Sequence, residues 1–178
     1  MKKNDFARVQ VGNKYGLINL KQQIIKNQWF DYCHNFICGF AVVQLNGKFN
    51  FIDKKGNYLS SQWFDECDDF NDGFAGVKLN KKWNYIDKQG NLLSNQWFDY
   101  CSHFFNEGFS VVMLNDDGWN FIDEQGNLLS GQWFDNCKNF QKDGFARVKF
   151  DDKDLFIDKN GKLYRKVTKY EPIEIEQK

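Results

Sequence analysis

Gln28-Trp29-Phe30-Asp31 is the first of four identical tetrapeptides in this chain. The same residues return at Gln62, Gln96 and Gln132, so successive copies begin 34, 34 and 36 residues apart. Self-similarity at a fixed period of this length is typical of repeat proteins, in which each copy packs mainly on its neighbours. The tetrapeptide therefore predicts a tandem-repeat array.

The residues around each tetrapeptide recur in the same phase. A cysteine lies two residues after the Asp, and a turn ending in glycine leads into Phe-Ala-x-Val, as at Phe40–Val43. A second apolar run ends on Ile-Asp, as at Ile52-Asp53, and the N-terminal segment Phe6–Val9 joins in the same phase. The chain is thus predicted to be a single domain over residues 1–164, with a C-terminal extension at 165–178 in which one strand is expected at Glu174-Ile175. Its approximate units are residues 5–39, 40–73, 74–108, 109–144 and 145–164.

The pattern within a unit predicts β-strands. Apolar and other residues alternate along Phe74–Leu79, and Trp83–Asp87 follows after a short loop. Asp87-Lys88-Gln89-Gly90-Asn91 indicates a tight turn, in which Gly90 supplies the left-handed residue, and Leu92–Ser94 forms a third, short strand. Each unit is therefore expected to be a three-stranded antiparallel meander or hairpin.

The segment after each tetrapeptide follows a different period. Trp97, Cys101 and Phe104 lie at positions i, i+4 and i+7, which is helical spacing. The stretch is too short for a stable helix, so it predicts one short helical or 3₁₀ turn per unit. The fold class is all-β, with about four and a half units of roughly 34 residues. Whether they form an open solenoid or a closed, propeller-like ring stays undecided.

Two repeat columns indicate special backbone positions. The residue after Trp83 is Asn84, and its counterparts are Gly16, Asn50, Asn120 and Leu155. Because Gly and Asn adopt positive φ most easily, this column indicates a bulge or twisted strand position, although a solvent-facing polar residue is an alternative. A second column holds only small residues, which suggests that neighbouring backbones approach closely there: Ala7, Ala41, Ala75, Ser110 and Ala146.

Together these motifs resemble the bacterial WG-repeat family. The shared pattern is aromatic-Gly/Asn-x-Ile-Asp-x-x-Gly, then an aromatic-Asp step and Gly-Phe-Ala-x-Val, over about residues 5–164. The Trp-Gly pair itself survives only as Tyr15-Gly16, and Asp154-Leu155 in the last copy indicates a degenerate capping unit. Gln22 also replaces the turn glycine of the first unit. The resemblance implies a β-rich repeat array and brings no catalytic residues or cofactor with it.

Charge and hydropathy exclude several classes of partner. The chain has 24 acidic and 24 basic residues, whereas a general nucleic-acid binder clusters Lys and Arg to displace counterions. No apolar run approaches the roughly 20 residues of a membrane helix, and no signal-peptide core follows Met1. We therefore expect a cytoplasmic protein that binds neither nucleic acid nor membrane.

The cysteines and histidines offer no convincing reactive centre. Cysteines recur once per unit, at Cys33, Cys67, Cys101 and Cys137, which favours buried packing of reduced thiols over metal binding or disulfides. His34 and His103 lie near two of them but at different positions in their units. The sequence therefore predicts no catalytic residue, metal site or cofactor.

Two functional classes remain. The first is a non-catalytic protein-interaction or scaffolding module, which binds an unknown protein through loops that differ between units. Its predicted surface consists of Lys78, Lys81, Lys82, Asn115, Asp116, Asp117, Asp151 and Asp152. The alternative is a repeat protein that binds carbohydrate or the cell envelope through arrayed aromatic, Asn and Asp side chains. The invariant columns are assigned to the repeat structure itself, and the tryptophans among them are expected to fill the core. These columns hold Trp29, Trp63, Trp97, Trp133 and the recurring cysteines Cys33, Cys67, Cys101 and Cys137.

Overall fold

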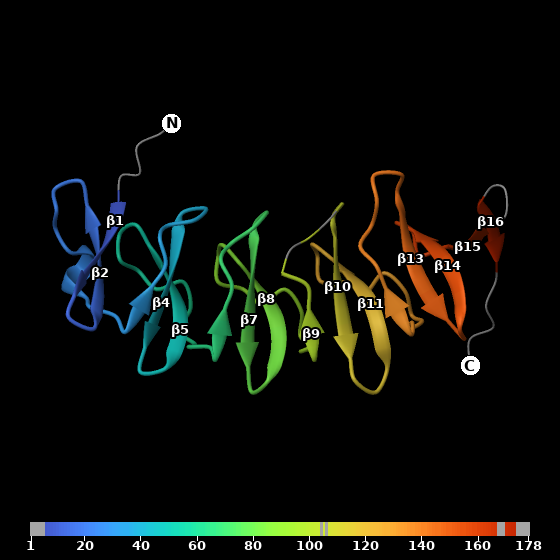
Figure 1. Ribbon diagram of the computed structural model, residues 1–178, viewed down its shortest axis with the longest axis horizontal. Coiled ribbons are helices and arrows are strands. Elements are labelled where there is room, and N and C mark those ends of the chain that lie inside the picture. The colour runs from blue at the N-terminus through green and yellow to red at the C-terminus, as the bar shows by residue number, and fades with distance from the viewer. Residues whose placement is uncertain (1–5, 104, 106, 167–169, 174–178) are drawn as a thin grey trace. The chain divides into compact units, whose positions relative to one another are not determined.

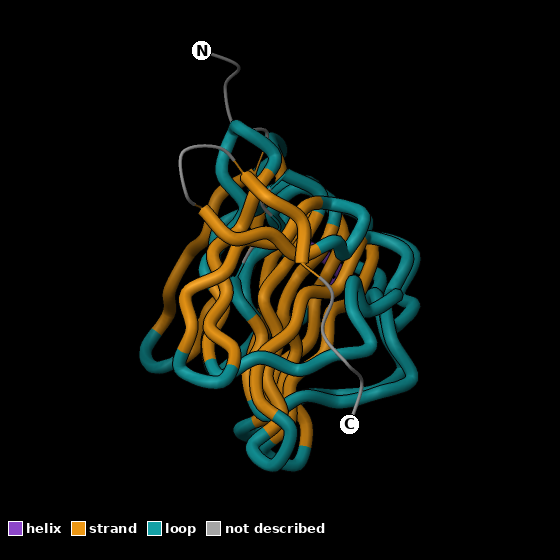
Figure 2. Tube along the Cα trace, turned by 90° about the vertical axis from the view of Figure 1, so that its right-hand side faces the viewer, coloured by secondary structure: helices purple, strands orange, loops and turns teal. Residues whose placement is uncertain are grey.

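The computed structural model describes residues 6–103, 105, 107–166 and 170–173. Contacts divide the chain into two compact units, which are described separately. Unit 1 is Met1–Lys81 with Tyr85–Leu92, and unit 2 is Lys82–Asn84 with Leu93–Lys178. Both are built from small antiparallel sheets joined by loops, as Figures 1 and 2 show, and this confirms the all-β repeat prediction.

In unit 1, the first sheet has two strands, β1 (Phe6–Val11) and β2 (Lys14–Asn19), followed by the 3₁₀ helix η1 (Ile25–Asn27). The second sheet has the order β3-β4-β5, and the third has the order β6-β7-β8. Strand β8 crosses the division between the units. The bounds are β3 (Tyr32–Cys33), β4 (Phe40–Leu45), β5 (Lys48–Asp53), β6 (Glu66–Cys67), β7 (Phe74–Leu79) and β8 (Lys82–Asp87).

In unit 2, one sheet has the order β11-β10-β9 and the other runs from β12 to β16 in sequence order. The bounds are β9 (Tyr100–Cys101), β10 (Phe109–Leu114), β11 (Gly118–Asp123), β12 (Asn136–Cys137), β13 (Phe145–Phe150), β14 (Lys153–Asp158), β15 (Leu163–Lys166) and β16 (Tyr170–Ile173). The sheet thus continues past residue 164, where the extension was expected to begin. A strand expected at Glu174-Ile175 lies outside the described residues.

The predicted helical turn after each tetrapeptide is wrong. Phe98 exchanges two backbone hydrogen bonds with Trp83, and Tyr100–Cys101 then forms β9, which pairs with β10. This segment links the edge of one strand to the next sheet along the chain. An extended chain covers about 3.3 Å per residue and a helix only about 1.5 Å, so the crossing favours extended backbone. The only described helix, η1, precedes Gln28.

The two faces of each sheet have distinct contacts. In the second sheet, Ala41, Val43 and Ile52 lie on one face, which we call the leading face, and all three are 0% exposed. They form one buried cluster with Leu17 of β2, so the leading face packs on the first sheet. We call the opposite face, which carries Phe40 and Phe51, the trailing face.

A phenylalanine from the next repeat covers the trailing face. Phe36 lies 5.0 Å from Phe6, ring to ring, and Phe70 lies 5.0 Å from Phe40 and 4.9 Å from Phe51. In unit 2, Phe140 of the last repeat occupies the same column and packs in the same way. The ring of Phe140 is 5.0 Å from both Phe109 and Phe121. We call Phe36, Phe70 and Phe140 the wedge residues, because each joins two successive sheets.

The tetrapeptide places its phenylalanine, rather than its tryptophan, in the core. The four tryptophans are all only half-buried: Trp29, Trp63, Trp97 and Trp133. The adjacent phenylalanines are at most 1% exposed: Phe30, Phe64, Phe98 and Phe134. The expectation that tryptophan fills the core is thus corrected, because neighbouring residues of an extended segment point to opposite sides.

Neither alternative predicted for the asparagine column is correct. Asn50, Asn84 and Asn120 are 0% exposed, and none has a positive φ. The Asn120 Nδ2 donates to the carbonyl oxygens of Ser130 at 2.8 Å and Gln132 at 3.3 Å. Its Oδ1 accepts a bond from the Phe121 amide at 2.8 Å. The asparagine therefore holds the loop that leads into the next tetrapeptide.

Turn glycines mark where successive repeats approach closely. Gly126 has a φ of +86°, and a Cβ there would lie 2.1 Å from the Leu93 carbonyl oxygen of the preceding repeat. Gly90 stands in the same column of unit 1, where a Cβ would lie 2.5 Å from the Leu59 carbonyl oxygen. Glycine is needed here both for its backbone conformation and for the space it leaves.

A candidate binding surface around strand β12

The residues predicted from the sequence as a binding surface lie at or beside the tips of hairpins. Asn80 and Lys81 both have positive φ, as a two-residue type I′ hairpin turn requires. Asp151 and Asp152 form a second such turn. The third tip is a three-residue loop, Asn115–Asp117, between the paired residues Leu114 and Gly118. These tip residues are all exposed, whereas Lys78 and Lys82 are half-buried.

Several of these residues already have partners within the chain. The Asp99 carboxylate accepts a hydrogen bond from the Asn115 amide at 2.9 Å and pairs with Lys82 Nζ at 2.6 Å. The hydrogen bond from Lys82 is the main cause that lowers the pKa of Asp99. Lys78 likewise pairs with Glu66 at 2.8 Å. The tetrapeptide aspartate thus holds the hairpin tip in place.

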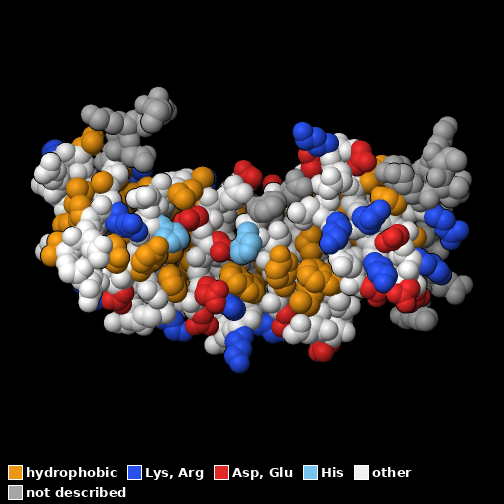
Figure 3. All heavy atoms as spheres, viewed as in Figure 1, with side chains coloured by type: hydrophobic (Ala, Val, Ile, Leu, Met, Phe, Trp, Pro, Cys, Tyr) orange, Lys and Arg blue, Asp and Glu red, His pale blue; other side chains and the backbone are white. Residues whose placement is uncertain are grey.

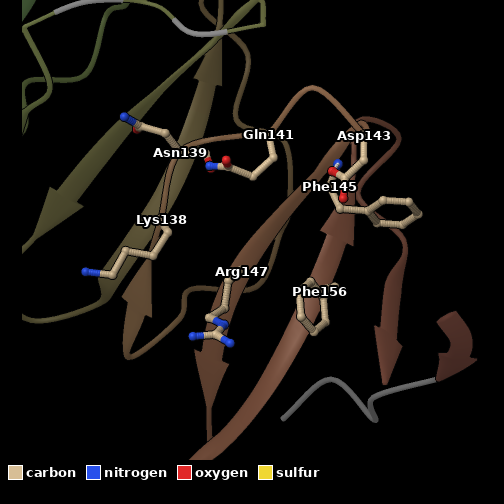
Figure 4. Close-up of a pocket in the computed structure, with 7 residues that line it drawn as sticks. All are labelled: Lys138, Asn139, Gln141, Asp143, Phe145, Arg147 and Phe156. Atoms are coloured by element: carbon tan, nitrogen blue, oxygen red, sulfur yellow. Dashed lines mark hydrogen bonds between the residues drawn. The ribbon is translucent and has the colours of Figure 1, made fainter. Parts of the chain in front are cut away.

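A different region of unit 2 is concave. A hollow of about 250 Å³, which we call the end hollow, lies on the trailing face of the last sheet (Figure 4). Phe145 and Arg147 reach it from β13, and Phe156 reaches it from β14. Its remaining lining residues follow β12 in the chain: Lys138, Asn139, Gln141 and Asp143.

Two further hollows adjoin it and share Lys138. One, of about 140 Å³, also contains Arg147 and lies over β12, β13 and β14. The other, of about 320 Å³, is a groove between the β9-β10-β11 sheet and β12. The groove is lined by Tyr100, Ser102, Val111, Trp119, Asn136, Cys137, Lys138 and Asn139. We call the three hollows together the β12 surface.

Two repeat columns change at the groove. In unit 1, His34 Nδ1 lies 2.9 Å from the Asp69 carboxylate. This pair joins two successive repeats at the position that corresponds to the groove. Ser102 occupies the column of His34, and Asn139 occupies the column of Asp69. Both line the groove.

The β12 surface combines aromatic rings with positive charge. Arg147 is exposed, and its guanidinium carbon lies 6.0 Å from the centre of the Phe156 ring. Lys149 pairs with Asp152 at 2.7 Å, and this hydrogen bond raises the pKa of Lys149. On the face shown in Figure 3, Lys and Arg side chains gather over β13 and β14. The surface therefore offers stacking faces together with hydrogen-bond donors.

The repeat alignment contains the signal that would have identified this region. Arg147 stands in the column of Val42, Gly76 and Val111, which are buried in the preceding sheets. Arg8 of β1 is the other charged residue in this column, and it is exposed as well. The sequence pointed instead to the loops, because their charge differs most between repeats.

Most of the cysteines are buried, as the prediction of a packing role requires. Cys33, Cys101 and Cys137 are buried, Cys67 is half-buried, and Cys38 is exposed. Burial raises the pKa of Cys33 to about 11 and raises the pKa of Cys137 further. A thiol with such a pKa forms little nucleophilic thiolate at neutral pH. Among the described residues, no group of His, Cys, Asp and Glu side chains is arranged to hold a metal ion.

A model of the WG containing repeat matches residues 15–49, 51–83, 85–117 and 119–153. No match was found among curated proteins. Within the described residues, no helix is long and apolar enough to cross a membrane.

Several solved structures match this chain over most of its length. Hsv2 from Kluyvelomyces marxianus is 12% identical with a TM-score of 0.45, and the match covers 89% of this chain and 61% of that one. BamB from Moraxella catarrhalis is 8% identical with a TM-score of 0.41, and the match covers 90% of this chain and 57% of that one. The chain thus spans about three-fifths of the length of these proteins.

Proposed function

Because this chain belongs to the WG containing repeat family, we propose that it is a non-catalytic protein-interaction module whose partner binds the β12 surface. The observation that supports this most is the meeting of three hollows at one residue, Lys138. Protein interfaces are enriched in aromatic residues and arginine, and Trp119, Phe156 and Arg147 supply both. We further expect the protein to act in a reducing compartment such as the cytoplasm, since its cysteines are free thiols.

A comparison of two charge reversals tests the proposed location. Lys138→Glu changes the residue common to the three hollows, whereas Lys81→Glu changes an exposed hairpin tip that was favoured by the sequence. Each variant would be used as bait in extracts of the native cell, with quantitative mass spectrometry of the recovered proteins. We expect Lys138→Glu to lose a specific protein that the wild type and Lys81→Glu both retain. Loss with Lys81→Glu alone would place the interface on the hairpin tips instead.

The side chains that line the groove favour carbohydrate binding as a second candidate function. Tyr100 and Trp119 line it together with Asn136 and Asn139, and the Tyr100 ring is 38% exposed. Aromatic faces beside amide groups can stack on a sugar ring and bond its hydroxyls. Glycan-array binding that Tyr100→Ala abolishes, with no protein recovered by the wild type, would favour this second function.

A further inference from the structure

A linking segment, made of the tetrapeptide and the short strand after it, covers one edge of the sheet that follows it. The four segments are residues 28–34, 62–68, 96–102 and 132–138. In the second sheet, the Asp31 amide donates to the Gln44 carbonyl oxygen at 2.9 Å. The His34 amide donates to the Val42 carbonyl oxygen at 2.8 Å. Each of the other three segments donates two such bonds, of 2.7 to 2.9 Å, to the same two columns.

The side chains of a linking segment also make recurring contacts. Its aspartate accepts a hydrogen bond from the amide of the hairpin tip, as Asp65 does from Asn80 at 2.7 Å. Its cysteine lies on the leading face, where Cys33 is 0% exposed. Its phenylalanine packs beside the last residue of the long strand, and the Phe134 ring lies 6.4 Å from the Phe150 ring. A linking segment is thus recognised by its backbone and by three side chains.

Among the described residues, no linking segment covers strand β1. Its sheet has two strands, β1 and β2 (Figure 1). Arg8 and Gln10 stand in the two columns whose carbonyl oxygens accept the bonds from a linking segment, and Gly12 stands in the column of Asn80. The backbone at Gly12 has a φ of +58°, close to the +51° of Asn80. An open strand edge is a template for pairing with another chain.

Apolar side chains are exposed along the same edge. Val11, the last residue of β1, is 65% exposed. Ala7 is also exposed, whereas Ala41 in its column is 0% exposed. The buried cluster around Ala41 includes Phe30 and Cys33 of the linking segment. The first sheet therefore exposes both the backbone and the apolar side chains that a linking segment contacts in the later sheets.

We propose that the outer edge of β1 binds an extended segment of a partner protein that carries an aromatic residue followed by aspartate. Two amides of this segment donate to the carbonyl oxygens of Arg8 and Gln10. Its aspartate accepts a hydrogen bond from the Gly12 amide, and its aromatic ring packs on Val11. Strand addition of this kind gains affinity from backbone bonds and specificity from side-chain contacts. The site lies in unit 1 and is separate from the β12 surface.

A peptide copied from the first linking segment is a suitable probe. It has the sequence of residues 28–35, Gln-Trp-Phe-Asp-Tyr-Cys-His-Asn, with Cys33→Ala to prevent oxidation. The peptide would be titrated into the isotopically labelled full chain while backbone NMR shifts are recorded. We expect saturable shifts over residues 8–12, with a Kd on the order of 1 mM.

Changes in the peptide and in the protein make the test specific. A peptide with Phe30→Ala should bind about tenfold more weakly, because truncation of an aromatic anchor removes much of its binding energy. A peptide with Asp31→Ala should no longer shift the Gly12 amide, since the carboxylate acceptor is absent. The protein variant Val11→Asp should weaken binding, whereas Leu20→Asp should not. Leu20 is similarly exposed, at 69%, but lies outside β1.

Absence of saturable shifts in β1, or equal binding of the original and Phe30→Ala peptides, would overturn the proposal. Shifts that appear only after residues 2–5 are deleted would overturn it as well, since the chain's own N-terminal segment would then be the occupant. Self-association of the chain that Val11→Asp abolishes would assign the edge to a second copy instead. The peptide should bind Lys138→Glu as it binds the wild type, so this test is independent of that for the β12 surface.

Discussion

At the scale of single residues, the positions of the repeated tetrapeptide have different structural roles, which the sequence alone does not reveal. In Gln-Trp-Phe-Asp, the phenylalanine is fully buried and the tryptophan is half-buried. The aspartate holds the next hairpin tip, as Asp99 holds Asn115. Because the tetrapeptide is identical in every repeat, each of its residues is expected to have a structural role, but the identity does not show which residue is buried and which forms hydrogen bonds.

The first prediction compares two neighbours in the third tetrapeptide. Phe98→Ala should lower the free energy of unfolding by about 3–5 kcal/mol, because Phe98 is 0% exposed and its removal leaves a cavity. Trp97→Ala should cost clearly less, since the indole is half-buried. Urea denaturation of both variants provides the measurement, and a larger loss for Trp97→Ala would contradict the placement of the two rings.

The second prediction concerns the buried asparagines. Asn120→Ala leaves the carbonyl oxygens of Ser130 and Gln132 without their donor inside the fold, so we expect a loss of about 2–3 kcal/mol in unfolding free energy. The exposed Asn115→Ala serves as the control and should stay within about 0.5 kcal/mol of wild type. An Asn120→Ala loss as small as that of the control would show that its bonds contribute little.

The third prediction concerns pH. Hydrogen bonds from Lys14, Lys48 and Lys82 are the main causes that lower the pKa values of Asp31, Asp65 and Asp99. A lowered folded-state pKa adds stability above the unfolded value of about 3.9, and that stability is lost as pH falls through the folded value.

The wild type should therefore lose thermal stability as pH falls below about 4. Asp99→Asn should be less stable than wild type at pH 7, and the gap should narrow in acid, because the substituted residue no longer titrates. Melting temperatures recorded from pH 7 to pH 2.5 check this. A gap that stays constant across the range would show that the ionised form of Asp99 adds nothing to stability.

At the scale of elements, the two long strands of each repeat followed from the sequence, but the third did not. The strand predicted at Leu92–Ser94 is wrong, because only a single bridge joins Leu92 to Ile86 there, and β6 is the third strand of that sheet. Alternation along Phe74–Leu79 and the Asp87–Asn91 turn were sufficient to predict the hairpins, because both are local features. The spacing of Trp97 and Cys101 favoured a helical turn, yet β9 forms there. The conformation of this segment is determined by its pairing with β10, which comes later in the chain. The spacing of residues within the segment carries no information about that pairing.

The polar columns show a second limit of sequence reasoning. Asn84 was expected to be a bulge or a solvent-facing residue, because polar side chains are seldom buried. Its column is buried because loop carbonyls lie within reach of the side-chain amide. The repeat alignment marks Arg147 as unusual, but it does not show the hollows of the β12 surface, because these depend on how successive sheets pack.

The fourth prediction uses two glycines with the same backbone conformation. Gly126 and Gly144 both have a φ of +86°, but only at Gly126 would a Cβ meet a backbone atom, the Leu93 carbonyl oxygen at 2.1 Å. Gly144→Ala should cost about 1–2 kcal/mol from backbone strain alone. Gly126→Ala should cost at least about 1 kcal/mol more, because tightly packed structure must shift to admit the methyl group. Equal losses in denaturant titrations would mean that the repeats do not approach as closely as described.

At the scale of the whole molecule, most repeat columns build the contacts between successive sheets, and some of their residues are accessible in the last described sheet. The column of Val42, Gly76 and Val111 is buried in three preceding sheets and becomes accessible at Arg147 in the last one. Terminal repeats commonly carry such polar faces for solubility. Here the face also contains aromatic rings and a hollow, and we therefore propose that it binds a partner.

The most direct test of this central claim uses the two arginines that share one column. Both are exposed, but Arg8 donates a hydrogen bond to the Cys33 carbonyl, whereas Arg147 lies over the Phe156 ring. The unfolding free energy and the amount of recovered partner protein would be measured for Arg8→Ala and for Arg147→Ala. We expect Arg8→Ala to lose about 1 kcal/mol of stability and to keep partner recovery. Arg147→Ala should stay within about 0.5 kcal/mol of wild type and lose most of the partner. Full partner recovery by Arg147→Ala would contradict the account.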